Sequence, residues 1–272
     1  MTAFPALPVD FEPTRATLHA YANAVAALPR VHAVAHPKWW HISLKIRPDG
    51  LVTEAMPLPE GGAVFVRMDP RNDEIVMEGS NGDRRSFPMD QGLTATEMGD
   101  ALIGAAAEWG LTGEYNRAKF ENDDPRVYDG QHAGELFEVF VTVEAAIAAH
   151  RNRIGGEVGP IQLWPHGFDL AFEWFGSKMV PHEEGGEVTE LPAQINVGFY
   201  PAGDAYFYSN PWPFDRDALL DVELPEGARW NTEGWEGSMF EYADLVGRAD
   251  GVERLLEHAG IVFDAASPLL QD

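Results

Sequence analysis

Short alternating segments separated by turn signals run through residues 39–87 and limit this part of the chain to one kind of fold. The separators are rich in Pro, Gly, Asn and Asp, and Asn81-Gly82 is a strong hairpin signal because both residues tolerate positive φ. The predicted strands are residues 39–46, 51–56, 63–68, 75–78 and 84–87. Five strands with short connections predict an antiparallel meander.

Helical periodicity predicts a helix before this meander and another after it. Residues 13–28 carry Leu18, Tyr21 and Val25 at helical spacing, and Pro29 is expected to end the helix. The other predicted helices are residues 94–109, 130–153 and 242–258, and the later predicted strands are residues 161–175, 194–200, 205–209 and 228–242.

The order helix, strands, helix therefore occurs twice. This order predicts an α+β fold with mainly antiparallel sheets flanked by helices. We expect two similar halves packed as one body, residues 1–115 and residues 116–272, with the second half carrying the aromatic and histidine motifs. One compact domain is the alternative, since 272 residues suit either arrangement.

Charge and composition exclude several classes of binding partner and of chemical site. The formal net charge is −25, from 44 acidic and 19 basic residues, and such a field repels phosphate backbones and anionic lipid surfaces. We therefore expect neither nucleic acid nor a membrane as a partner. The chain has no cysteine, which excludes disulfides, thiol nucleophiles, zinc ribbons and iron–sulfur clusters. Without a signal-like N-terminus or a long apolar run, the expected location is the cytoplasm.

The densest motifs lie in the second half. In residues 161–175, strict alternation places His166, Phe168 and Phe172 on one face of a strand, with Asp169 and Glu173 on the other. A bulge near Gly167 would bring His166 beside Asp169. Aromatic residues also crowd the segments 205–213 and 228–237, more densely than one buried face requires.

These segments resemble a bacterial family known as domain of unknown function family 5996. The shared motifs are Leu163-Trp164-Pro165-His166, Phe168-Asp169-Leu170-Ala171, Tyr206-Phe207-Tyr208, Pro211-Trp212-Pro213, Gly227-Ala228-Arg229-Trp230 and Thr232-Glu233-Gly234-Trp235, with Trp39-Trp40-His41 and Leu51-Val52-Thr53 as echoes in the first half. The resemblance covers about residues 17–256 and implies a shared fold, but no activity. Relatives often carry histidine at the positions of Gly167 and Asn231, so a metal bound there in relatives would lack two ligands here.

Three functions remain open at this point. The first is small-molecule binding in an aromatic-lined pocket, because tyrosine and tryptophan combine contact area with a polar handle. The residues expected to line it are Trp39, Trp40, His41, Trp164, His166, Tyr206, Tyr208, Trp212, Trp230 and Trp235.

The second is an enzyme, a hydrolase or isomerase that is metal-assisted or uses general acid/base catalysis. Its candidate residues are His166, Asp169, Glu233 and Glu236. No spacing imposes a metal geometry, and no cofactor is assigned. The third is a protein-interaction module, including a homo-oligomer in which aromatic surfaces of two copies pair. The alternative to all three functions is that these aromatic residues are abundant because they pack in the core.

Overall fold

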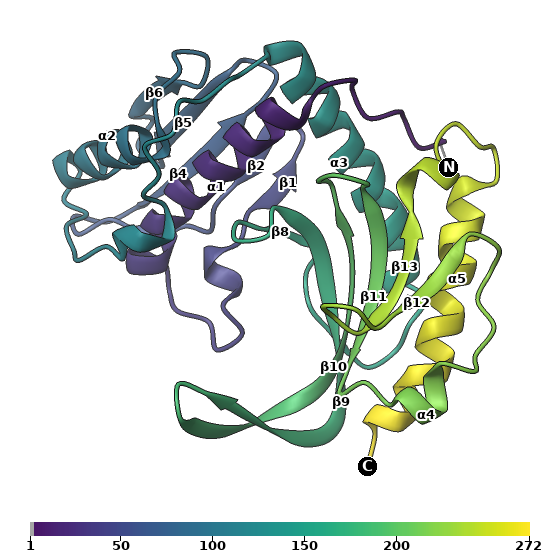
Figure 1. Cartoon of the computed structure of the whole chain (residues 1–272). Helices are drawn as coiled ribbons and strands as arrows, with labels where there is room; N and C mark the ends of the chain where they lie inside the picture. The colour runs from purple at the N-terminus through teal and green to yellow at the C-terminus, as the bar shows by residue number, and fades with distance from the viewer. Residues whose placement is uncertain (1–2) are drawn as a thin grey trace. The chain divides into compact units, whose positions relative to one another are not determined.

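The computed structural model describes residues 3–272 and confirms the α+β class (Figure 1). The chain forms two compact units. The N-terminal unit comprises residues 7–141 and 162–168, and the C-terminal unit comprises residues 3–6, 142–161 and 169–272. The expected division between residues 115 and 116 follows chain order. In the structure, residues 3–6 instead belong to the C-terminal unit and residues 162–168 belong to the N-terminal unit. Helix α3 (Gly130–Arg151) begins in the first unit and ends in the second.

The sheet of the N-terminal unit is the predicted meander. Its strands run antiparallel in the order β1-β2-β4-β5-β6, and β3 pairs with β4. Their bounds are β1 Lys45–Arg47, β2 Gly50–Val52, β3 Met56–Pro57, β4 Ala63–Asp69, β5 Glu74–Gly79 and β6 Arg84–Pro88. Gly82 turns between β5 and β6 with a φ of +92°, as its hairpin signal predicted.

Two helices accompany this sheet in the N-terminal unit. They are α1 (Glu12–His32) and α2 (Ala95–Glu108), which contact each other. Thr94 caps α2 through a capping box with Glu97, so two backbone N–H groups that the helix leaves unpaired are satisfied. The helix α1 does not end at Pro29. Proline in the last turn removes a single hydrogen bond, and the turn is closed by the Ala33 N–H, which donates to the Pro29 carbonyl at 3.0 Å.

The sheet of the C-terminal unit has the path β12-β13-β11-β10-β9-β7, and its described pairs are antiparallel. The bounds are β7 Glu157–Val158, β9 Asp169–Glu184, β10 Glu187–Tyr200, β11 Tyr206–Trp212, β12 Ala228–Asn231 and β13 Gly237–Glu241. Helix α5 (Gly251–Ala266) contacts β10, β11 and β13, and lies along this sheet in Figure 1. A short helix α4 (Arg216–Leu219) follows β11.

Alternation gives this sheet two unlike faces. The face toward α5 is apolar and fully buried, with aromatic side chains from four neighbouring strands. Its central residues are Phe172, Phe199, Phe207 and Phe240. The opposite face carries polar side chains and tyrosines. The alternation predicted for Asp169 and Glu173 against Phe172 is therefore confirmed.

Several further sequence-based assignments are wrong. Residues 228–242, predicted as one strand, form β12 and β13 with a loop between them. Residues 161–175 are not one strand. The strand β8 (Gln162–Trp164) ends in a turn closed by the Phe168 N–H, which donates to the Trp164 carbonyl at 2.7 Å, and Phe168 has a φ of +56°. Pro165 and Gly167 suit this turn better than a strand.

Residues 39–46 begin with a 3₁₀ turn (Trp40–Ile42) rather than a strand, since Trp39 takes a left-handed φ of 60°. The last helix is also displaced. A 3₁₀ turn (Tyr242–Asp244) precedes it, and Gly247, with a φ of +69°, separates that turn from α5. Among the described residues, no helix combines the length and apolarity needed to cross a membrane.

Candidate functional site

The polar face of the C-terminal sheet carries the most concentrated set of polar and aromatic groups in this unit. We call it the tyrosine face, defined by Asp169, Glu173, Asn196, Tyr206 and Tyr208. The register brings these strands together, because Asn196 on β10 pairs with Glu173 on β9 and with Asn210 on β11. Glu173 is buried, and the other four are half-buried.

A hydrogen bond spans the face from β11 to β9. The Tyr208 hydroxyl donates to Asp169 Oδ2 at 2.5 Å. Gly198 of β10 lies between the two strands, and a Cβ atom there would be 2.5 Å from the Tyr208 hydroxyl oxygen and 2.8 Å from the Ala171 Cβ. Since real Cβ contacts are not that short, glycine is what allows the tyrosine ring to lie across β10.

Electrostatics keep the Tyr208 hydroxyl protonated. Burial raises its pKa well above 10, and the Asp169 and Glu173 carboxylates raise it further, because a phenolate would repel them. Burial raises the pKa of Tyr206 as well, with smaller contributions from Tyr200 and Asp169. Tyr208 is therefore a fixed hydrogen-bond donor at neutral pH.

Aromatic rings border this hydrogen bond. Trp235 stacks on Tyr206, with ring centroids 6.0 Å apart and planes 10° apart, and meets Tyr208 edge-on at 6.3 Å. The Trp235 carbonyl accepts a 2.6 Å hydrogen bond from Asn231 Nδ2, which fixes the loop between β12 and β13. Gly237 gives the indole room, since a Cβ there would lie 2.7 Å from the ring.

The side-chain oxygen of Asn196 on this face lacks a hydrogen-bond donor among the described residues. Within residues 3–272, the buried Oδ1 of Asn196 has no hydrogen-bond partner. Buried polar atoms are nearly always paired, so such an atom calls for an explanation. A donor group on a bound molecule would supply it.

The structure separates the predicted site residues into two sets. In the C-terminal unit, Tyr206, Tyr208 and Trp235 come together with Asp169. Trp230 and Trp212 do not join them. The Trp230 indole N–H donates to the Val222 carbonyl at 3.0 Å, and Trp212 contacts His182. Both have packing contacts of their own.

The remaining predicted carboxylates have other contacts. Glu236 pairs with Arg216 at 2.5 Å, and Glu233 is exposed in the loop. Neither shares the Tyr208 hydrogen bond of Asp169. Across residues 3–272, no three His, Asp or Glu side chains gather as metal ligands would.

The other predicted residues lie in the N-terminal unit. His166 is exposed, its carbonyl accepts from His19 Nε2 at 3.1 Å, and its ring lies 5.8 Å from that of Trp164. The expected bulge that would turn His166 toward Asp169 is instead the turn after β8. Trp39, Trp40 and His41 form a separate stacked group around the 3₁₀ turn.

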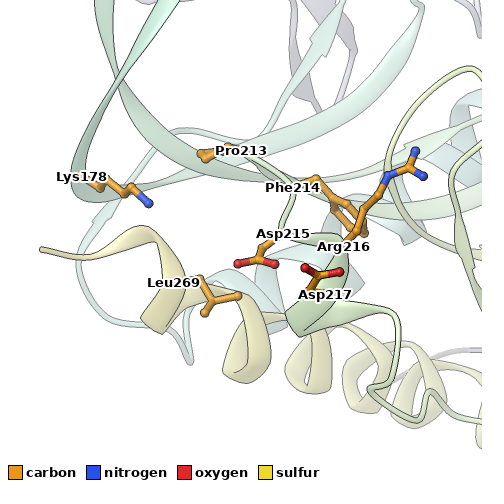
Figure 2. A pocket seen from close by; sticks show the side chains of 7 residues that line it. All are labelled: Lys178, Pro213, Phe214, Asp215, Arg216, Asp217 and Leu269. Atoms are coloured by element: carbon orange, nitrogen blue, oxygen red, sulfur yellow. The ribbon is translucent and has the colours of Figure 1, made fainter.

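A wide depression of about 520 Å³ lies elsewhere on the C-terminal unit (Figure 2). Its lining residues are Lys178, Pro213, Phe214, Asp215, Arg216, Asp217 and Leu269. Asp215 caps α4 through the Ala218 N–H at 3.1 Å, and Arg216 pairs with Glu236. Two of its charged groups are thus engaged in local structure, and no predicted site residue lines it.

Sequence reasoning missed two members of the site. Asn196 and Gly198 lie in a predicted strand, and neither was among the candidate site residues. The available signal was Gly198 itself, because glycine inside a strand often marks close approach of another group. Which side chain approaches Gly198 depends on the order of the strands in the sheet.

The fold and the tyrosine face define an α+β protein with a polar, aromatic-bordered sheet face. The family model described as "Family of unknown function (DUF5996)" matches residues 4–271. The chain therefore belongs to this family, as its motifs predicted. No match was found among curated proteins or among solved structures.

Proposed function

We propose that this protein binds a small molecule on the tyrosine face. The observation that carries the proposal is the hydrogen bond between Tyr208 and Asp169, which crosses β10 at Gly198. The stacked rings of Tyr206 and Trp235 lie beside it. Rings fixed next to a few oriented polar groups are typical of small-molecule sites. The unpaired Oδ1 of Asn196 adds an acceptor on the same face.

The groups on this face favour an uncharged or cationic ligand. Asp169, Glu173 and Asn196 offer acceptor oxygens, and the chain carries a net charge of −25. An anion would be repelled, whereas hydroxyl or ammonium donors would be attracted. Trp235 and Tyr206 add aromatic surface for a sugar-like ring or an amine. The ligand class is thus a cyclic polyol or a small organic amine.

A thermal-shift screen with these two classes, and with carboxylates for comparison, tests the proposal. A polyol or an amine should raise Tm, and calorimetry should then give Kd for the wild type and for variants. Tyr208→Phe and Trp235→Ala should weaken binding by about tenfold or more, since each removes a main contact. Trp230→Phe is the matched control, because its indole bonds to Val222 away from this face. Equal affinity in all four proteins would refute the assignment.

General acid/base catalysis at the same residues is a second candidate. It is favoured by the contact between Asp169, a carboxylate, and the protonated Tyr208 hydroxyl. An Asp169 base with a Tyr208 proton donor would suit isomerisation or hydrolysis. Once a ligand is found, Asp169→Asn separates the two functions. Under the enzyme proposal turnover is abolished while binding persists, and under the binding proposal no turnover occurs in either protein.

A further inference from the structure

One part of this acidic chain is free of acidic residues. Residues 13–48 contain five Arg or Lys and four His but no Asp or Glu, although the chain holds 44 acidic residues in 272. This segment covers most of α1 and the 3₁₀ turn after it. The segment therefore carries a formal charge of +5, although Arg15 and Lys45 pair with Glu12 and Glu54 outside it.

The end of this segment is a stacked aromatic group. Trp39 stacks on His41 with centroids 5.5 Å apart, and His36 stacks on Trp40 at 4.3 Å. The Arg30 guanidinium lies 5.7 Å from the centroid of the Trp39 ring. We call these five residues the Trp39 cluster.

The cluster presents N–H donors. His41 Nδ1 accepts from the His36 N–H at 3.1 Å, and His36 Nδ1 accepts from the Lys38 N–H at 3.2 Å. Each neutral imidazole must therefore carry its proton on Nε2, as a donor. Within residues 3–272, Nε2 of His36 and of His41 has no hydrogen-bond acceptor, and Arg30 has no carboxylate partner. Burial lowers the pKa of His41, and the neighbouring Arg30 and His36 lower it further, so its ring is neutral at pH 7.

The backbone holds Trp39 in an uncommon conformation. Its φ of 60° is left-handed, a region that bulky residues rarely adopt because the backbone is strained there. The Trp39 residue nevertheless remains 55% exposed. An exposed tryptophan in this conformation gains little from burial, which favours a role in contact with another molecule.

We propose that the Trp39 cluster binds a small monocarboxylate attached to a flat ring. Arg30 would receive the carboxylate, because a guanidinium matches its geometry, and the His Nε2–H groups would supply further donors. The exposed part of the Trp39 indole would contact the ring. A phosphate is disfavoured, since its second charge would add to the repulsion from a chain of net charge −25. This site lies in the N-terminal unit and does not depend on the tyrosine face.

Benzoate and its uncharged isostere benzamide are the probes. Calorimetry should show saturable binding of benzoate in the millimolar range, with benzamide and phenyl phosphate at least about tenfold weaker. In ¹H–¹⁵N spectra, benzoate should shift the Trp39 indole N–H, which the Trp39→Asn variant assigns. A phosphate preference, or equal binding of benzoate and benzamide, would overturn the proposal.

Two variants and one control complete the test. Arg30→Gln should lower benzoate affinity at least about tenfold. Trp39→Asn should do the same without loss of stability, because asparagine tolerates the left-handed conformation. The control Arg85→Gln removes an exposed arginine paired with Glu108 in the same unit, and should leave affinity unchanged. Unchanged affinity in Arg30→Gln or Trp39→Asn would overturn the proposal, as would an equal loss in Arg85→Gln.

Discussion

The stability of this protein should fall steeply between pH 6.5 and pH 4 because of two histidines in the core of the C-terminal unit. His150 at the end of α3 and His258 on α5 are 3% and 1% exposed. His258 Nε2 lies 2.9 Å from the Ser238 hydroxyl, while His150 Nε2 and His258 Nδ1 have no partner in the described part of the chain. A proton added to either ring would place a charge among apolar groups.

The pKa shifts give the magnitude. Burial lowers the pKa of both rings from 6.5 to about 4; Arg153 adds to the effect at His150, and His150 adds to it at His258, while Asp264 opposes it at His150. A pKa lowered from 6.5 to about 4 corresponds to ~3 kcal/mol for each histidine.

The sign follows from proton binding. Because the folded-state pKa values are lowered, the unfolded chain binds more protons between pH 4 and pH 6.5. The contribution to the free energy of unfolding is complete above pH 6.5, decreases as the pH falls, and is lost below about pH 4. From pH 7 to pH 5 the loss is ~2 kcal/mol per histidine, or ~4 kcal/mol for both.

Urea unfolding at a series of pH values measures this effect. His150→Gln and His258→Gln should each remove about half of the histidine contribution to the pH dependence, whatever they do to stability at pH 7. The exposed His166, replaced by Gln, is the control and should leave the dependence unchanged. If the double variant keeps the wild-type difference between pH 7 and pH 5, the reasoning is wrong.

Three further variants test the packing around the site and one helix start, each by urea unfolding at pH 7. Tyr208→Phe should cost about 1–2 kcal/mol, because Asp169 loses a donor; no loss would mean that this hydrogen bond adds nothing to stability. Gly198→Ala should cost about 1–3 kcal/mol, less in a Tyr208→Ala background, since the new Cβ would meet the Tyr208 ring; equal costs in the two backgrounds would refute the contact. Thr94→Ala should cost about 1 kcal/mol through loss of the capping box of α2, and a far smaller cost would mean that the cap is unimportant.

Local signals predicted much of the fold. The strand β4, the hairpin at Gly82 and the start of α2 at Thr94 were predicted within a residue or two, because alternation, turn residues and caps act over a few positions. The errors arose where a local pattern had two interpretations. Trp-Trp-His-Ile alternates like a strand, yet a left-handed Trp39 starts a 3₁₀ turn instead.

The site was less predictable than the fold. The aromatic motifs pointed to Tyr206, Tyr208 and Trp235, but the same criterion also selected Trp212 and Trp230. Trp212 contacts His182 farther along β11, and the Trp230 indole bonds to Val222. Composition cannot distinguish a ring on the tyrosine face from one that packs against its neighbours. The Trp39 cluster was visible as a motif, although its cation, Arg30, lies in the preceding helix and entered no motif.

The Tyr208–Asp169 pair shows why the remaining information was not local. These residues are 39 positions apart, and no spacing rule connects them. They meet because β10 lies between β9 and β11, and because the register places Gly198 opposite both Ala171 and Tyr208. A shift of one residue in the β10–β11 pairing would turn Tyr208 to the α5 face, and a shift in the β9–β10 pairing would turn Asp169 there, so either would separate the two side chains. The site is therefore specified by strand order and register, and the apolar alternation that buries Phe172, Phe199 and Phe207 fixes the register.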